Sequence, residues 1–168
     1  TDAAGLASLA LEVDAAPLGP VLVPYFDGER TPPLPEATGS IVGLRPSTTR
    51  AELARAAHDG VLCGLLDGLD ALRAAGVAAD GEVLLVGGGA RSAAFRRRGA
   101  DLLGREVRVP DTDEVVATGA AVLGAAALDG ADPAAIARAW DLGAGPVVEP
   151  DPAADPDTVR ARYRAAAG

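Results

Sequence analysis

Residues 82–92 read Glu-Val-Leu-Leu-Val-Gly-Gly-Gly-Ala-Arg-Ser, and this stretch decides the class of the fold. The apolar run predicts a strand over residues 82–86, and the residues after the glycines predict a helix over 92–103. Three consecutive glycines carry no Cβ, so a flat base or a phosphate can touch the backbone there. The amides that open the following helix would add hydrogen-bond donors and a partial positive charge.

The glycine turn does not match the two best-known phosphate-binding motifs. A Walker A loop needs a Lys after its glycines, and all 15 basic residues of this chain are Arg. The third glycine of a dinucleotide fingerprint would fall at Ala93 or Ala94. The turn by itself therefore leaves two interpretations open, a structural tight turn and a nucleotide contact.

Length and composition exclude several classes of function. A chain of 168 residues can bury a core of its own, and its net charge of −9 argues against binding to nucleic acid or anionic membranes. Cys63 is the only cysteine, so no internal disulfide can form and a reducing cytoplasm is the expected compartment. We find no signal peptide and no apolar run long enough to span a bilayer.

Short strands alternate with helices along the chain, which predicts an α/β fold. Thr49 and Glu52 form a capping box that opens a long helix ending before Gly76. Asp113 and Glu114 suit the positive end of a later helix. The predicted helices cover about 1–13, 49–75, 92–103, 112–128, 133–140 and 157–167, the predicted strands cover 21–26, 40–44, 82–86 and 106–109, and residues 27–38 and 141–157 are predicted to be irregular.

The long helix carries two lines of residues at helical spacing. One is an apolar face, and the other is a row of glycines that favours close packing against a neighbouring helix or sheet. Each glycine costs roughly 1 kcal/mol of helix stability relative to Ala, so the row needs a structural reason. The apolar face comprises Leu62, Leu65, Leu66, Leu69 and Leu72, and the glycine row comprises Gly60, Gly64 and Gly68.

Few side chains have the chemistry of a site. Asp27, Glu29 and Arg30 follow a predicted strand in a proline-stiffened loop, a common place for ligands in α/β proteins, although a solvated turn with a local ion pair is the simpler interpretation. His58 is the only histidine, so we expect a structural role and no metal site. The run from Arg96 to Arg98 could grip phosphate, but a solvated helix face is the stronger interpretation.

Taken together, five stretches resemble the FGGY carbohydrate kinases and, within them, the bacterial xylulokinases. They occur in the order typical of that family and cover roughly residues 20–128. The segment Gly-Glu-Arg-Thr-Pro at 28–32 is the part that points to xylulokinases over glycerol kinases. The five stretches are Val23–Pro32, Gly39–Leu44, Glu52–Ala56, Val86–Ser92 and Thr118–Ala121.

The resemblance implies a ribonuclease-H-like domain of the actin/hexokinase type that binds ATP with Mg²⁺ while a separate N-terminal domain holds most of the sugar. It implies phosphoryl transfer to a sugar such as D-xylulose, with an Asp as general base. That Asp and the family's phosphate loop would lie outside these residues, so no catalytic residue is expected here and no activity is expected of the chain alone. The implied nucleotide contacts are Gly87, Gly88, Gly89, Ala90 and Ser92, with Asp27, Glu29 and Arg30 on the cleft or phosphate side.

Two departures from the family pattern and several alternatives accompany this interpretation. His58 stands where an aliphatic residue is usual, and Ala93 occupies a position that is an adenine-contacting Asn in some members. Ribulose or gluconate could replace xylulose, and a homodimer is possible. The chain could instead be a free-standing nucleotide-binding or regulatory module derived from a sugar kinase, or a helical interaction protein. We expect a helix and linker over 1–19, the kinase domain core over 20–128 and a helical tail over 129–168.

Overall fold

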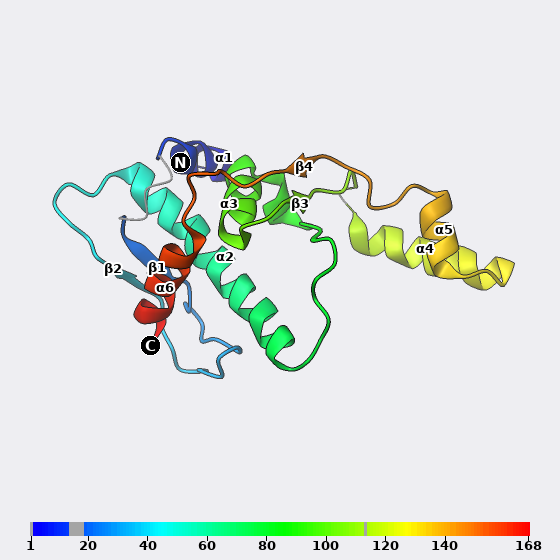
Figure 1. The fold of residues 1–168 in the computed structure, drawn as a ribbon, viewed down its shortest axis with the longest axis horizontal. Helices are drawn as coiled ribbons and strands as arrows, with labels where there is room; N and C mark the ends of the chain where they lie inside the picture. The colour runs from blue at the N-terminus through cyan, green and yellow to red at the C-terminus, as the bar shows by residue number, and fades with distance from the viewer. Residues whose placement is uncertain (1, 14–18, 113) are drawn as a thin grey trace.

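The computed structural model describes residues 2–13, 19–112 and 114–168, in which helices predominate over short strands (Figure 1). Its elements follow the predicted order with few exceptions. They are α1 (Ala3–Leu11), β1 (Val21–Val23), β2 (Ser40–Val42), α2 (Arg50–Ala74), a 3₁₀ turn η1 (Gly88–Arg91), α3 (Ala93–Leu103), β3 (Val107–Arg108), α4 (Val115–Asp129), α5 (Pro133–Ala139), β4 (Val147–Val148) and α6 (Pro156–Ala167).

The long helix α2 is the axis of the fold, and the predicted signals define both of its ends. Thr49 Oγ1 accepts from the amide of Glu52, and the Glu52 carboxylate accepts from the amide of Thr49, which completes the capping box. At the other end Gly76 adopts φ +84°, and its amide donates to the carbonyl of Arg73. Helices α1, α3 and α6 and strand β1 all pack on α2.

The glycine row on α2 has one member that the packing requires. A Cβ at Gly60 would overlap the carbonyl oxygen of Leu22 on β1, so helix and strand meet backbone to backbone there. A Cβ at Gly64 would make ordinary contact with Tyr163, and one at Gly68 would meet nothing within 4 Å. The expectation of close packing is therefore confirmed at Gly60 and wrong at Gly68, because no atom of a neighbouring element lies close to that side of the helix.

The main core lies where β1, α2, α3 and α6 meet. Helix α6 contributes the fully buried Tyr163, and α2 contributes Leu62 and Cys63. The predicted apolar face of α2 is only half covered, since Leu65 is 59% exposed and Leu72 is 51% exposed. That part of the prediction is wrong for the described residues, because α6 meets this half of the helix on another side, where Arg160 and Arg164 pair with Asp67 and Asp70. Buried residues of this core are Val23, Tyr25, Leu62, Cys63, Leu102 and Tyr163.

The strands form two separate antiparallel pairs. Strand β1 pairs with β2, Val21 opposite Val42, and is shorter than the predicted 21–26. Strand β3 pairs with β4, with Val107 opposite Val148. Strand β4 lies inside residues 141–157, which were predicted to be irregular. The prediction of a strand over residues 82–86 is wrong. This segment is extended, but only Leu84 forms a bridge, parallel to Arg108, because no second partner lies on its other edge among the described residues.

Helices α4 and α5 pack on each other and reach away from the body of the molecule, next to β3 and β4 (Figure 1). The helix predicted to start at about Thr112 begins at Val115. Asp113 lies outside the described residues, and Glu114 precedes α4 without a capping hydrogen bond from its side chain. No single helix in the described ranges has the length and apolar character to cross a membrane, although α4 and α5, bent by 116°, meet that criterion as a pair.

Candidate functional site

The glycine turn begins where two parallel segments end. The amide of Leu85 donates to the carbonyl of Arg108 over 2.8 Å, and the amide of Arg108 donates to the carbonyl of Val83 over 2.9 Å. Gly87 then turns the chain at φ +89°, a conformation that strains residues with a Cβ. Carboxyl ends of parallel strands are the usual ligand-binding edge of α/β proteins, so the turn lies where that rule places a site.

Beyond Gly87 the chain forms the 3₁₀ turn η1 and then α3. The amide of Ala90 donates to the carbonyl of Gly87, and the side chain of Ser92 caps α3 by accepting from the amide of Phe95 over 3.2 Å. Ala90 is buried under the turn, whereas the glycines are exposed. The predicted strand–turn–helix order is thus reproduced, with a 3₁₀ turn inserted before the helix.

The three glycines differ in what a side chain would meet. A Cβ at Gly87 or Gly88 would enter open space, so a ligand can reach the backbone at both positions. A Cβ at Gly89 would instead lie 3.1 Å from the ring of Phe95. Positive φ is needed at Gly87 alone of the three. Gly88 is therefore the position at which an added side chain tests ligand contact without a clash inside the protein.

A cleft of about 550 Å³ opens beside this turn, which is large enough for a nucleoside. Its walls come from the extended segment before the turn, from η1 and α3, and from the backbone that follows β3. Leu85, Val86, Gly87, Ala90, Arg91, Arg96, Val109, Pro110, Asp111, Thr112 and Pro146 line it.

The three consecutive arginines of α3 have different surroundings. Arg96 lines the cleft, whereas Arg97 makes a 2.7 Å ion pair with Asp151. Arg98 is buried and bonds to Asp59 over 2.7 Å and to Asp101 over 2.8 Å. The expected solvated face is therefore wrong for Arg98. Burial lowers the pKa of its guanidinium, but the hydrogen bonds to Asp59 and Asp101 and the attraction of their charges together outweigh that effect and hold the pKa above its usual value.

None of Asp27, Glu29 and Arg30, the residues predicted for the cleft or phosphate side, lines the cleft beside the glycine turn. The Glu29 carboxylate accepts from the backbone amides of Arg30, over 2.6 Å, and Thr31, over 3.1 Å. The side chains of Asp27 and Arg30 are exposed. No ion pair joins Arg30 to any residue in the described ranges, so the local ion pair suggested for this turn is not formed there.

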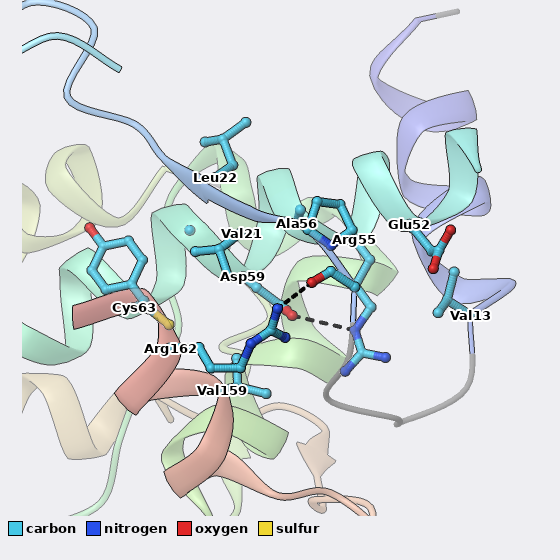
Figure 2. A pocket seen from close by; sticks show the side chains of 14 residues that line it. Val13, Val21, Leu22, Glu52, Arg55, Ala56, Asp59, Cys63, Val159 and Arg162 are labelled. Atoms are coloured by element: carbon cyan, nitrogen blue, oxygen red, sulfur yellow. Dashed lines mark hydrogen bonds and ion pairs between the residues drawn. The ribbon is translucent and has the colours of Figure 1, made fainter. Parts of the chain in front are cut away.

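A second hollow, drawn in Figure 2, lies between β1, α2 and α6 and has a volume of about 130 Å³. Inside it Arg55 pairs with Asp59 over 3.3 Å, and Arg162 donates to the carbonyl of Gly19 over 2.5 Å (Figure 2). This volume admits a few water molecules but no nucleotide or sugar. Its polar groups hold the elements together, and the cleft beside the glycine turn is the better candidate site.

His58 and the acidic residues offer no centre for a metal. The Nδ1 atom of His58 lies 2.9 Å from the carbonyl oxygen of Ala54 one turn earlier, which satisfies the ring within α2. Among the residues that the structure describes, no three His, Cys, Asp or Glu side chains gather closely enough to bind a metal ion.

Comparison with known proteins decides the family. Residues 1–128 match the profile of the C-terminal domain of the FGGY family of carbohydrate kinases. The chain belongs to the FGGY family of carbohydrate kinases. The FGGY domain identified in this way has the actin/hexokinase-type ATPase fold that the family resemblance implied.

Individual FGGY kinases are similar over most of the chain. It is 47% identical over 131 residues to the xylulose kinase of Streptomyces rubiginosus, and 38% identical over 162 residues to the glycerol kinase of Rhodopirellula baltica. The crystal structure of xylulose kinase from Bifidobacterium adolescentis matches 100% of the chain with a TM-score of 0.75 and 38% identity. The chain spans only 27%, 30% and 32% of these three proteins.

Proposed function

We propose that this chain is the C-terminal, nucleotide-binding part of an ATP-dependent sugar kinase that phosphorylates D-xylulose. The observation that carries the proposal is the exposed glycine turn at the carboxyl ends of two parallel segments, next to a cleft of nucleoside size. The similarity to xylulose kinases supports the choice of sugar. A kinase for ribulose, gluconate or glycerol is the alternative, since a glycerol kinase is also similar over nearly the whole chain.

In this proposal the chain binds and orients the nucleotide. The amides of η1 and the open faces of Gly87 and Gly88 receive the adenosine end, and Ser92 fixes the start of α3 by capping it. Mg²⁺ supplies charge neutralisation on the transferred phosphate when it is bound. The described residues provide no three-ligand cluster, so the ion would be held mainly by the phosphates and by groups upstream.

The general base and the groups that select the sugar are assigned to the part of the kinase that precedes these residues. The chain spans only 27% and 32% of two xylulose kinases it matches, and no residue of the cleft has the form of an activated base. We therefore expect residues 1–168 alone to have no kinase activity. ATP-dependent phosphorylation of D-xylulose by the purified chain would contradict that expectation.

A chimera tests the proposal directly. The upstream part of the Streptomyces rubiginosus xylulose kinase is joined to residues 1–168, and phosphorylation of xylulose, ribulose, gluconate and glycerol is assayed with ATP. We expect xylulose kinase activity whose sugar preference follows the upstream part.

Gly88→Val in the chimera should raise the KM for ATP at least tenfold and leave the KM for xylulose nearly unchanged. Gly68→Val is the matched control, because it adds the same side chain to an open position on α2, outside the cleft. Equal KM values for ATP in the two variants would remove the nucleotide assignment.

A further inference from the structure

The cleft beside the glycine turn contains two opposite charges that have no protein partner. In the described ranges, neither the guanidinium of Arg96 nor the carboxylate of Asp111 makes a hydrogen bond or an ion pair. The next two arginines of the same helix, Arg97 and Arg98, are both paired with carboxylates. Two unpaired charges on the walls of one cleft are positioned for a ligand that can satisfy both.

Asp111 sits on a fixed piece of backbone. Its amide donates to the carbonyl of Ala144 over 2.8 Å, and the amide of Val109 donates to the carbonyl of Pro146 over 2.9 Å. Gly145 packs so closely that a Cβ there would overlap the carbonyl oxygen of Val109. A carboxylate on such a backbone loses little conformational entropy when it binds a ligand.

Arg96 faces the same cleft from α3, four residues after the helix cap Ser92. Apolar groups from Leu85, Val109, Pro110 and Pro146 complete the walls. These apolar groups can contact the face of an aromatic base, and a guanidinium can stack on a base or donate to its ring nitrogens.

The charges of Arg96 and Asp111 indicate which end of a nucleotide the cleft can bind. A triphosphate would be attracted by Arg96 but repelled by Asp111, whereas a nucleoside carries no charge. Its ribose hydroxyls are donors suited to a carboxylate, and its base has acceptors suited to a guanidinium.

We propose that Asp111 binds the ribose hydroxyls and Arg96 binds the base of the nucleotide, so that the adenosine end lies in the cleft against the glycine turn. This inference rests on the proposed nucleotide-binding function and adds two residues that recognise the nucleoside. It makes the site selective for ribonucleotides, because a ligand without the 2′-hydroxyl leaves part of the Asp111 carboxylate unsatisfied.

The test for Asp111 combines two ligands with two proteins. Isothermal titration calorimetry measures ADP and 2′-deoxy-ADP binding to residues 1–168 and to the Asp111→Ala variant. We expect the unaltered chain to bind ADP about tenfold more tightly than 2′-deoxy-ADP, the scale of one hydrogen bond to a charged group. In Asp111→Ala the two affinities should become equal through a loss for ADP. Asp129→Ala, at the exposed end of α4, is the control and should keep the tenfold preference.

The test for Arg96 uses adenosine and ADP. Arg96→Ala should weaken both ligands by the same factor if the guanidinium contacts the base. A loss confined to ADP would place Arg96 at a phosphate and overturn its assignment. Circular dichroism of each variant confirms that the helices are intact.

The outcomes separate this inference from the proposed function. Tight ADP binding with no preference over 2′-deoxy-ADP, unchanged in Asp111→Ala, overturns the ribose assignment and leaves the nucleotide site standing. Absence of binding by both nucleotides to the unaltered chain would remove the nucleotide site and this inference together.

Discussion

The guanidinium of Arg98 on α3 lies 2.7 Å from the carboxylate of Asp59 on α2, and their side chains are only 6% and 14% exposed. Arg98 also bonds to Asp101, and Asp59 also bonds to Arg55, so the pair belongs to a buried ionic cluster. This cluster fixes the helix that follows the glycine turn against the central helix of the fold.

Removal of Arg98 should destabilise the protein strongly. Breaking a buried pair leaves an uncompensated charge and typically costs about 3–5 kcal/mol. We expect the lower end of that range for Arg98→Ala, because Arg55 remains beside Asp59 and Arg97 beside Asp101. The control is Arg138→Ala, whose pair with Asp132 is 3.8 Å long and exposed, and which should cost less than about 1 kcal/mol. Urea unfolding measures the free energy of unfolding of both variants. Equal losses of that free energy in Arg98→Ala and Arg138→Ala would contradict the structural role of the cluster.

Two glycines on α2 should respond in opposite directions to the same substitution. Gly68→Ala meets open space and should stabilise the protein by up to about 1 kcal/mol through helix propensity. Gly60→Ala drives a methyl group into the backbone carbonyl of Leu22 and should destabilise it by about 1–3 kcal/mol. Melting temperatures of the two variants give the comparison. A stable Gly60→Ala protein would mean that β1 and α2 are further apart than described.

The thiol of Cys63 should be unreactive in the folded protein. Burial raises its pKa to about 12, and the residue is 1% exposed. Because the thiolate is the reactive form, a thiol reagent at pH 8 should not label the native chain but should label it fully in denaturant. Rapid labelling without denaturant would show that the core around α2 and α6 opens readily.

Acid should destabilise the protein through its helix caps. The amide of Thr49 holds the pKa of Glu52 below its usual value, and the amide of Thr158 does the same for Asp155. A depressed pKa in the folded state adds stability above the pKa of the unfolded chain, and that stability is lost as pH falls through the folded value. We expect a constant melting temperature above about pH 5 and a decline below about pH 4. The side chain in Glu52→Gln cannot titrate, so the melting temperature of this variant should decline less steeply as pH falls. An acid profile identical to that of the unaltered protein would argue against the capping box as a source of the pH dependence.

Substitution of the exposed loop residue Arg30 tests whether its role is functional or structural. No residue in the described ranges pairs with its guanidinium, so Arg30→Ala should shift the melting temperature very little. If the loop closes on the nucleotide or its phosphates in the complete kinase, kcat should fall in the chimera with the upstream part of a xylulose kinase. An unchanged kcat would assign Arg30 to the solvated turn.

Local signals made much of this fold predictable. The capping box at Thr49 and the turn at Gly76 act within a few residues, and both helix boundaries that they predict are observed. Strand formation depends on distant partners, which explains why residues 82–86 remain an extended segment with one bridge to Arg108. Strand β4 was missed for the same reason, since its two valines lie among Pro and Gly and pair with β3 about 40 residues earlier.

The candidate site also combines a feature set by neighbouring residues with features that depend on distant partners. The glycine turn was visible as a run of three residues, whereas the cleft depends on Asp111 and Pro146, which lie far along the chain. The burial of Arg98 depends on Asp59, 39 residues earlier, although its spacing of three from Asp101 on one helix was a signal that the sequence offered.

The outlying position of α4 has a consequence for how the chain would behave by itself. Val116 is 89% exposed, Leu128 is 86% exposed and Leu123 is 61% exposed, all on a helix that only α5 covers substantially. Bare aliphatic surface of this kind attracts chaperones and proteases and promotes self-association. We expect the apparent molar mass of residues 1–168, measured by light scattering, to rise with concentration, a behaviour that a free-standing regulatory module would have been selected to avoid.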